Sequence, residues 1–424
     1  MEAVLLFSFL GMTAVGVPVA FALALSVSII LYYFLGMPQV MITQIMYSGV
    51  DSFSFMAVPF FMLAGTFMSA GGVTSRLVNF AQAMVGSFTG GLAQVVAVSG
   101  MFFAAISGSS AATTAAIGST MVNEMEKKGY RRELATGIVA AGGTVGIVIP
   151  PSITLVVFGV IAGTSIGDLF VGGLVPGILM GLTMCAVSWV IAKREGIPAE
   201  GNFSFMALLK SFKDSFWALM TPVIIIGGIY GGIFTPTEAA AVAAVYGIFV
   251  GLFIYKELKL RDFPKIIFKA VIGTTLIMFI VGAAKVFGWM LTNLEIPHHI
   301  GAYIVSMTDS PVVFLLMMNV LLLFIGTLIN ASAAVVILTP IFLPVAVQLG
   351  IDPLFFGVLM VINLAIGCIT PPVGLDLFVA SAITKVPLER VMRASMPYLL
   401  SLLATLAVLT LCPAVITFLP NLLH

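Results

Sequence analysis

Two short clusters of small polar residues interrupt long apolar stretches of this sequence. The first cluster is Ser107-Gly108-Ser109-Ser110, and the second is Asn330-Ala331-Ser332. A pair of prolines follows each cluster, Pro150-Pro151 after the first and Pro371-Pro372 after the second. Hydroxyl, amide and backbone carbonyl oxygens are the ligands that hard cations take. The clusters therefore indicate cation binding by neutral oxygen atoms.

Each proline pair follows a segment that contains glycine and threonine. Proline removes a backbone donor and clashes with the preceding helical turn, while glycine lets the chain leave the helix. The carbonyl groups freed at such a break need partners, because hydrocarbon supplies none. A polar cluster and a break in each half therefore predict two matching sodium sites. Their predicted ligands are Ser107, Gly108, Ser109, Ser110, Gly142, Thr144, Gly146, Pro150, Asn330, Ala331, Ser332, Gly367, Thr370 and Pro371.

The same breaks create helix ends inside the membrane. Helix C-termini attract cations and helix N-termini attract anions, so an anionic substrate is expected between the two sodium sites. The predicted substrate contacts are Ser110, Ser152, Thr154, Ser332 and Asp376. For Asp376 the alternative is a structural carboxylate paired with another side chain. For the small polar residues the alternative is close helix packing.

The composition requires a membrane protein. Of the 424 residues, 61% are hydrophobic and 8% are charged, whereas about 25% are charged in an average soluble protein. The 18 Lys and Arg residues nearly balance the 17 Asp and Glu residues, so no basic surface for nucleic acid is expected. Several apolar runs are too short to cross about 30 Å of hydrocarbon and indicate half-helices and re-entrant hairpins. The first run, 3–35, is expected to form a single span.

The chain contains an internal repeat. A shift of 221 residues places Pro371-Pro372 on Pro150-Pro151 and Pro397 on Pro176 without a gap. Segment 127–132 carries four Lys or Arg residues, whereas the matching segment 349–353 carries none. By the positive-inside rule the first segment is cytoplasmic and the second faces outward. The halves are therefore expected to have opposite orientations, as in inverted-repeat transporters.

Two further segments have recognisable local patterns. Segment 200–217 places aromatic and aliphatic residues on one side and charged residues on another, which predicts an interfacial amphipathic helix. Farther along, Pro236 interrupts an apolar run. Thr237 is expected to cap the next helix, with Glu238 in its first turn.

Three motifs resemble those of one family of transporters. They are Thr235-Pro236-Thr237-Glu238-Ala239, Gly146-Ile147-Val148-Ile149-Pro150-Pro151-Ser152 and Thr370-Pro371-Pro372-Val373-Gly374-Leu375. Together they resemble the large, DctM-like membrane subunit of tripartite ATP-independent periplasmic (TRAP) transporters. The resemblance implies an all-α polytopic membrane protein of the ion-transporter superfamily. It implies an inverted repeat with two re-entrant helical hairpins, two Pro-Pro broken helices and an elevator mechanism.

The resemblance also implies a substrate and partners. The chain is expected to import a carboxylate, such as sialic acid or a C4-dicarboxylate, across the bacterial inner membrane with sodium as coupling ion. A small four-helix membrane subunit, a periplasmic substrate-binding protein and membrane lipid are the expected partners, and no organic cofactor is expected. The family's ion-binding tips map onto 107–110 and 330–332, and its unwound helices onto 142–151 and 367–372.

An elevator mechanism and the repeat together divide the chain into moving and fixed parts. The two halves of the transport domain each contain a hairpin and a broken helix, and the remaining helices form the scaffold and its arms. The predicted divisions are 1–90 (scaffold and arms), 91–168 (transport domain), 169–311 (scaffold and arms), 312–386 (transport domain) and 387–424 (C-terminal scaffold helix).

Two other functions compete with this one. A self-sufficient sodium/carboxylate symporter of the same superfamily would share the hairpins but need no binding protein, and it remains the alternative. An intramembrane serine protease needs a histidine within reach of its nucleophile. His298, His299 and His424 lie outside plausible reach of the hairpins. We therefore expect no enzyme activity.

Overall fold

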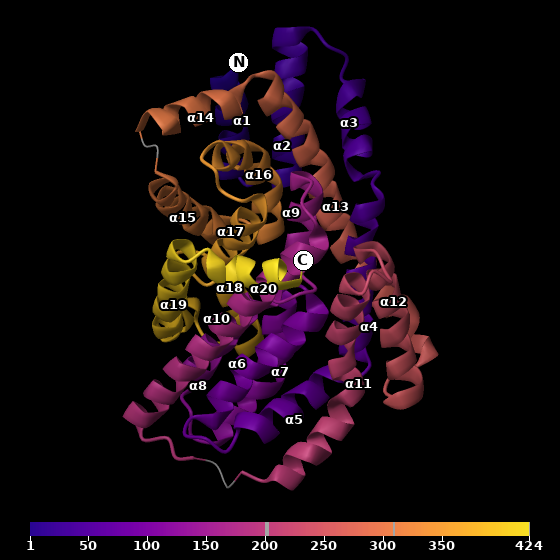
Figure 1. Ribbon diagram of the computed structural model, residues 1–424, viewed down its shortest axis with the longest axis vertical. Helices are drawn as coiled ribbons and strands as arrows, with labels where there is room; N and C mark the ends of the chain where they lie inside the picture. Colours follow the sequence, from indigo (N-terminus) through magenta and orange to yellow (C-terminus); the bar gives the residue numbers. More distant parts are fainter. Residues whose placement is uncertain (200–202, 308–309, 424) are drawn as a thin grey trace.

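The computed structural model describes residues 1–199, 203–307 and 310–423, and this part of the chain is built from helices. Its only extended pairing is an isolated bridge between Thr89 and Ala199. Eight of the described helical segments are long and apolar enough to cross a membrane. Figure 1 shows α14 near one end of the long axis and the N-terminal part of α11 at the other. The expected multi-pass architecture is therefore confirmed.

The first half of the repeat consists of a helical hairpin, a broken helix and a long helix. The break lies between Ile147 and Ile153, at the predicted proline pair. The elements are α6 (Gly91–Ser107), α7 (Ser110–Lys127), α8 (Arg132–Thr144), the 3₁₀ turn η3 (Val145–Ile147), α9 (Ile153–Ala162) and α10 (Ile166–Glu195).

The second half repeats this order. Its elements are α15 (Pro311–Leu328), α16 (Ala331–Gln348), α17 (Pro353–Gly367), α18 (Leu375–Thr384) and α19 (Leu388–Leu411). Pro176 lies inside α10 and Pro397 inside α19, as the repeat requires. Both Pro-Pro peptide bonds are cis. Two hairpins, two broken helices and their repetition were thus predicted correctly.

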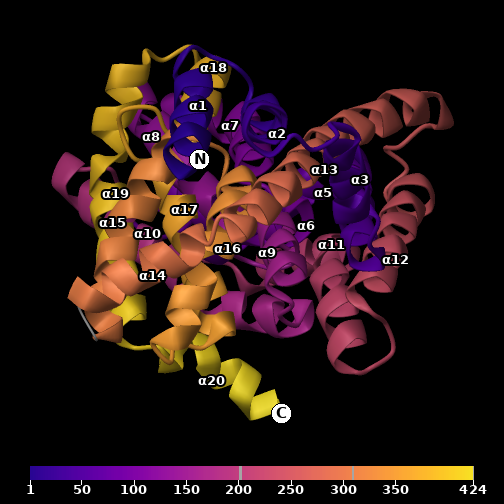
Figure 2. The ribbon, with the colours of Figure 1, turned by 90° about the horizontal axis from the view of Figure 1, so that it is seen from above.

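The other helices surround these two halves. They are α1 (Glu2–Ala14), α2 (Val19–Ile30), η1 (Leu31–Leu35), α3 (Val40–Val50), η2 (Phe53–Met56), α4 (Ala57–Ala70), α5 (Val73–Val85), α11 (Phe205–Tyr230), α12 (Pro236–Phe249), η4 (Val250–Ile254), η5 (Leu260–Asp262), α13 (Phe263–Asn293), α14 (Ile296–Met307) and α20 (Ala414–Leu423). Figure 2 shows α16, α17 and α9 near the centre, with α11 and α12 at the edge.

The expectation of one span over 3–35 was wrong. The run forms two helices, α1 and α2, which pack against each other. Pro18 directly precedes α2 in an extended conformation, with φ −56° and ψ 136°. Because proline cannot supply the backbone donor that a continuing helix needs, the chain turns there.

Two local expectations also need correction. The amphipathic segment is no separate helix, since α11 continues from Phe205 through the following apolar run to Tyr230; residues 200–202 of the predicted segment lie outside the described part. The helix cap before α12 is Thr235, which forms a capping box with Glu238. The Thr237 hydroxyl instead donates to the Phe53 carbonyl, at 3.0 Å. Thr237 therefore ties α12 to η2.

The two halves pack across each other. Helix α9 of the first half packs on α16 of the second, and α18 of the second half packs on α7 and α8 of the first. Helices α10 and α19, which were assigned to the scaffold, pack on both broken helices and on each other. A transport domain limited to 91–168 and 312–386 would therefore have to slide along α10 and α19. The domain boundaries remain a prediction.

Candidate functional site

The tip of the first hairpin contains a cluster of hydrogen-bonded hydroxyl groups. Gly108 ends α6 in the left-handed region with φ +60°, a conformation that glycine adopts without strain. Ser109 then caps α7, accepting the Ala112 N–H at 3.4 Å. The Thr113 hydroxyl donates to the Ser109 carbonyl and lies 2.9 Å from the Ser107 hydroxyl. Three oxygen atoms from one turn thus lie close together.

The first broken helix touches this tip. A Cβ atom added to Gly146 would lie 2.5 Å from the Thr113 hydroxyl and 2.7 Å from the Ser109 carbonyl oxygen. Only glycine permits this approach, since real Cβ contacts are longer. After the break, Ser152 caps α9, accepting the Leu155 N–H and donating to the Ile147 carbonyl. The predicted first sodium site therefore has its hairpin and its break in contact.

Of the three other predicted ligands of this site, Thr144 and Gly142 lie away from the tip and Pro150 lies beside it. The Thr144 hydroxyl is buried and donates to the Ala141 carbonyl of its own helix, at 2.7 Å. Gly142 faces Val96 of α6 rather than the tip. The proline pair lies beside the tip, because a Cβ added to Gly108 would approach the Pro151 carbonyl oxygen to 2.8 Å.

The second hairpin repeats the arrangement with different side chains. Asn330 caps α16, and its side chain accepts the Ser332 N–H at 2.9 Å. A Cβ added to Gly367 would lie 2.6 Å from the Cα atom of Gly326, so the first hairpin helix meets the break at two glycines. The Gly374 N–H donates to the Thr327 carbonyl. The second tip is thus also joined to its own break.

The two tips differ in exposure. Ser107 and Ser110 of the first tip are buried, whereas Asn330 is exposed and Ser332 is partly exposed. Among the remaining predicted ligands of the second site, Ala331 and Gly367 are buried, while Thr370 and Pro371 are partly exposed. The Thr370 hydroxyl donates to the Ile366 carbonyl at 2.8 Å.

The predicted substrate contacts come together as two pairs that join the halves. The Thr154 hydroxyl at the start of α9 lies 3.1 Å from the Ser332 hydroxyl at the start of α16. Asp376 at the start of α18 is completely buried, and the Ser110 side chain approaches it from α7. The Ser152 hydroxyl is already engaged in capping α9. Four of the five predicted substrate contacts thus lie where the two halves meet.

Asp376 is buried without an ion pair. No described Lys or Arg pairs with it. The Ser110 side chain approaches it, but neither carboxylate oxygen has a partner of good hydrogen-bond geometry among the described residues. A buried carboxylate with so little compensation is unfavourable. The role of Asp376 as an ion or substrate contact stays a prediction.

A buried chain of amides was not predicted from the sequence. The Asn363 amide donates to the Asn319 side-chain oxygen at 2.8 Å, and the Asn319 amide donates to the Thr410 hydroxyl at 2.8 Å. The Asn363 oxygen has no partner in the described structure. This chain links α17, α15 and α19. An asparagine inside each of two apolar runs is the sequence signal that could have identified it.

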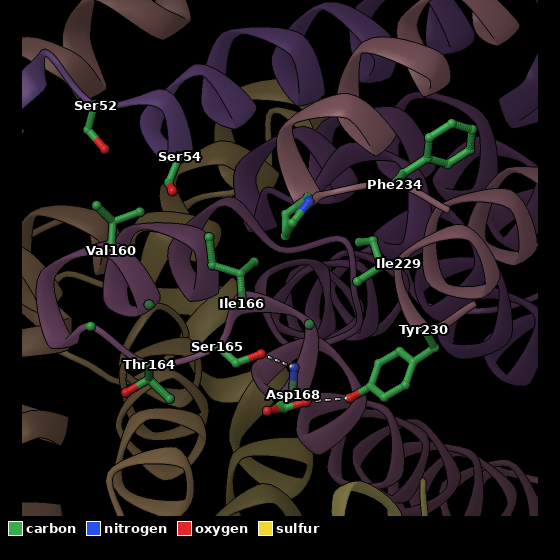
Figure 3. Close-up of a pocket in the computed structure, with 14 residues that line it drawn as sticks. Ser52, Ser54, Val160, Thr164, Ser165, Ile166, Asp168, Ile229, Tyr230 and Phe234 are labelled. Atoms are coloured by element: carbon green, nitrogen blue, oxygen red, sulfur yellow. Dashed lines mark hydrogen bonds between the residues drawn. The ribbon is translucent and has the colours of Figure 1, made fainter. Parts of the chain in front are cut away.

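A polar pocket of about 710 Å³ lies away from both tips (Figure 3). It opens between the end of α9, the start of α10 and the turn from α11 to α12. The Tyr230 hydroxyl donates to the Asp168 carboxylate at 3.0 Å, and the Asp168 N–H donates to the Ser165 hydroxyl. The Tyr230–Asp168 hydrogen bond joins the end of the predicted transport half 91–168 to α11 of the predicted scaffold.

Metal binding by ionisable side chains is not supported at either tip. The described residues contain no group of three or more His, Cys, Asp or Glu side chains that could hold a metal ion. The oxygen atoms that the tips present are hydroxyls and carbonyls. These are ligands for an ion such as sodium and not for zinc or another transition metal.

Comparisons with known proteins agree with this architecture. The chain is 46% identical to the C4-dicarboxylate TRAP transporter large permease protein DctM of Pseudomonas aeruginosa over 371 residues, 88% of this chain and 87% of that protein. It is 38% identical to the sialic acid TRAP transporter large permease protein SiaM of Vibrio cholerae over 417 residues, 98% of each chain. Its fold resembles the Alcanivorax borkumensis YdaH transporter, with a TM-score of 0.63, 14% identity and 84% coverage of both chains.

The family comparison covers nearly the whole sequence. The family described as "Tripartite ATP-independent periplasmic transporter, DctM component" matches residues 6–415. The curated relatives are named as transporter permeases, which is not an enzymatic role. The chain therefore belongs to the DctM family, the large permease component of TRAP transporters.

Proposed function

We propose that the chain is the large permease of a sodium-coupled importer that carries an organic acid across the bacterial inner membrane. A periplasmic binding protein delivers the acid, and a small four-helix membrane subunit completes the permease. Family membership supports the tripartite assembly. The observation that supports the substrate assignment is the meeting of the two halves at Thr154 and Ser332. The sodium assignment rests on the uncharged oxygen atoms that the two hairpin tips bring together.

Sodium at the hairpin tips would prepare the site for an anion. Each tip presents uncharged oxygen atoms beside a break, and these suit a cation that has lost its water. A cation near the midplane reduces the electrostatic cost of placing a carboxylate there. The hydroxyls of Ser110, Thr154 and Ser332 then face the region between the two ions, where they donate hydrogen bonds to the substrate.

The substrate is a carboxylate in this proposal, and two kinds are tested first. The relatives named for C4-dicarboxylate and sialic acid transport support these choices. The C4-dicarboxylate relative has the higher identity, so succinate is the first compound to examine. Both compounds present a carboxylate that hydroxyl donors bind.

The decisive experiment is uptake into proteoliposomes that contain the chain and its small subunit. Labelled succinate and sialic acid are compared with and without an inward sodium gradient, and with and without the cognate binding protein. We expect uptake only when both sodium and the binding protein are present. Sodium-driven uptake without the binding protein would instead identify a self-sufficient symporter, and uptake indifferent to sodium would refute the coupling.

The sodium sites are tested separately from overall uptake. Replacing Ser110 or Ser332 by alanine should raise the sodium concentration needed for half-maximal uptake. Unchanged sodium dependence in both variants would refute the site assignment.

The mechanism in this proposal is an elevator movement of the hairpins and broken helices past the remaining helices. Cysteine pairs that join 107–110 to α11 should crosslink differently in the inward-facing and outward-facing states. Identical crosslinks in both states would refute the movement.

A further inference from the structure

A second polar cavity lies at the end of the molecule that carries the basic segments. Its volume is about 710 Å³, and its walls come from α5, the first half of α11 and the residues after α12. By the positive-inside rule this end faces the cytoplasm. The cavity is separate from both hairpin tips, and none of its lining residues is a predicted sodium or substrate contact.

One wall of the cavity is fixed and electrically neutral. The Arg76 guanidinium donates to the Glu257 carboxylate at 2.6 Å and to the Gly72 carbonyl at 2.8 Å. It also lies over the Tyr255 ring, 3.8 Å from its centroid. The Tyr255 hydroxyl in turn accepts the Ala218 N–H of α11 at 3.1 Å. These contacts hold the cavity open between helices that are distant in sequence.

The opposite wall carries a net positive charge. Lys210 and Lys213 line the cavity from α11, and both are exposed. No ion pair involves either lysine within the described chain. Asp214 is the one acidic side chain of α11 that lines the cavity, and it balances one of the two lysines. The cavity therefore attracts an anion.

An apolar hollow adjoins the cavity along the same helix. Its volume is about 780 Å³, and it shares Lys210, Lys213 and Trp217 with the polar cavity. Its floor is formed by Phe212 and Phe216, whose rings are 6.1 Å apart, and Trp217 lies 5.6 Å from Phe216. A ligand with an anionic head group and an apolar tail would fill both the polar cavity and the apolar hollow.

We propose that this cavity and hollow bind one anionic phospholipid of the cytoplasmic leaflet, with its phosphate on Lys210 and Lys213 and an acyl chain along Phe212 and Phe216. The negatively charged lipids of that leaflet are attracted to basic residues beside the membrane. Tryptophan is enriched at this depth because it presents both an apolar ring and a hydrogen-bond donor. A protein helix laid on the same surface would bury two lysines without partners, which is unfavourable.

The test is native mass spectrometry of the purified full chain in detergent, alone and with its small subunit. The protein is titrated with phosphatidylglycerol and with zwitterionic phosphatidylethanolamine. The double variant K210Q/K213Q should bind the first phosphatidylglycerol about thirty-fold more weakly, from the typical contribution of two lysines beside a membrane. Phosphatidylethanolamine binding should change little.

A matched control separates a specific site from general lipid attraction. Lys265 and Lys269 are also exposed, lie one turn apart on α13 and do not line the cavity. The variant K265Q/K269Q should bind phosphatidylglycerol as the unchanged chain does. Equal weakening in the two double variants would overturn the proposal, because the lipid would then be part of a general shell.

A second measurement tests whether protein covers the surface. A cysteine introduced by S211C is labelled with a maleimide in the chain alone and in the complex, and the unsubstituted chain gives the background of its own three cysteines. Phosphatidylglycerol should reduce labelling in both preparations. Protection by the small subunit in the absence of added lipid would show that the subunit occupies the surface, and would overturn the proposal.

Discussion

The contact between the first hairpin tip and its break gives a sharp prediction at Gly146. The change Gly146→Ala places a Cβ atom 2.5 Å from the Thr113 hydroxyl and 2.7 Å from the Ser109 carbonyl oxygen. Ser109 is a predicted sodium ligand, and the Thr113 hydroxyl donates to its carbonyl oxygen. Overpacking of this kind costs about 1–3 kcal/mol, so the tip should be displaced in the sodium-free protein.

The magnitude follows from that cost. In the variant, sodium binding must return the displaced tip to its normal position at a free-energy cost of about 1–3 kcal/mol. This cost corresponds to about 5- to 150-fold weaker sodium binding. The assay is the sodium concentration for half-maximal uptake in proteoliposomes. A second readout is the increase in melting temperature on adding sodium, since a ligand that binds the folded state stabilises it. That increase should shrink in the variant.

Gly227→Ala is the matched control. Gly227 lies inside α11, is not a predicted sodium ligand, and no heavy atom lies within 4 Å of its added Cβ. This change should leave sodium affinity unaltered and slightly favour the helix, because alanine is the better helix former. Equal sodium affinities in Gly146→Ala and Gly227→Ala would refute the assignment of the tip.

Three further predictions concern the junction of the halves and the polar pocket lined by Asp168 and Tyr230. Asp376→Asn should raise the melting temperature in sodium-free buffer, since a buried carboxylate without an ion pair is removed, and should lower sodium-driven uptake; a lower melting temperature would contradict this account. Thr154→Val and Ser332→Ala should be non-additive in substrate affinity by about 1 kcal/mol in a double-mutant cycle, whereas strict additivity would mean that their hydroxyls do not act together. Tyr230→Phe removes the hydrogen bond to Asp168 and should increase the rate of substrate exchange across proteoliposomes; an unchanged rate would show that this contact does not restrain the movement.

The breaks and hairpins could be predicted because their causes are local. The pairs Pro150-Pro151 and Pro371-Pro372 interrupt a helix, whereas the single prolines Pro176 and Pro397 lie within helices. The cluster at 107–110 supplies both a glycine for the turn and a serine for the cap. The repeat then strengthened each assignment, since the same backbone chemistry recurs 221 residues later at Pro371.

The errors arose where neighbouring elements decide the outcome. The run 3–35 is uniformly apolar, so hydropathy could not distinguish one span from the two helices that meet at Pro18. Thr235 and Thr237 are both suitable helix caps, and only the backbone shows that Thr235 forms the capping box. The amphipathic pattern after residue 203 was real, but nothing in it indicated that α11 continues into the membrane.

The pairing of the two halves could not be derived from local sequence. Thr154 and Ser332 are 178 residues apart, and no pattern in a single chain indicates that their hydroxyls meet. The same holds for Asp376 and Ser110, which belong to helices of different halves. Such contacts depend on how α9 lies on α16 and α18 on α7.

This crossed packing has a thermodynamic consequence. Each hairpin carries the ligands proposed for one ion, yet its second helix supports the broken helix of the other half. An ion that orders one hairpin therefore also orders groups that hold the substrate across the junction. Linkage is reciprocal: if sodium raises substrate affinity by about ten-fold, substrate must raise sodium affinity by the same factor. Under the proposed sodium coupling, neither species would need to bind tightly alone, and each would hold the other during the proposed transition between the two sides of the membrane.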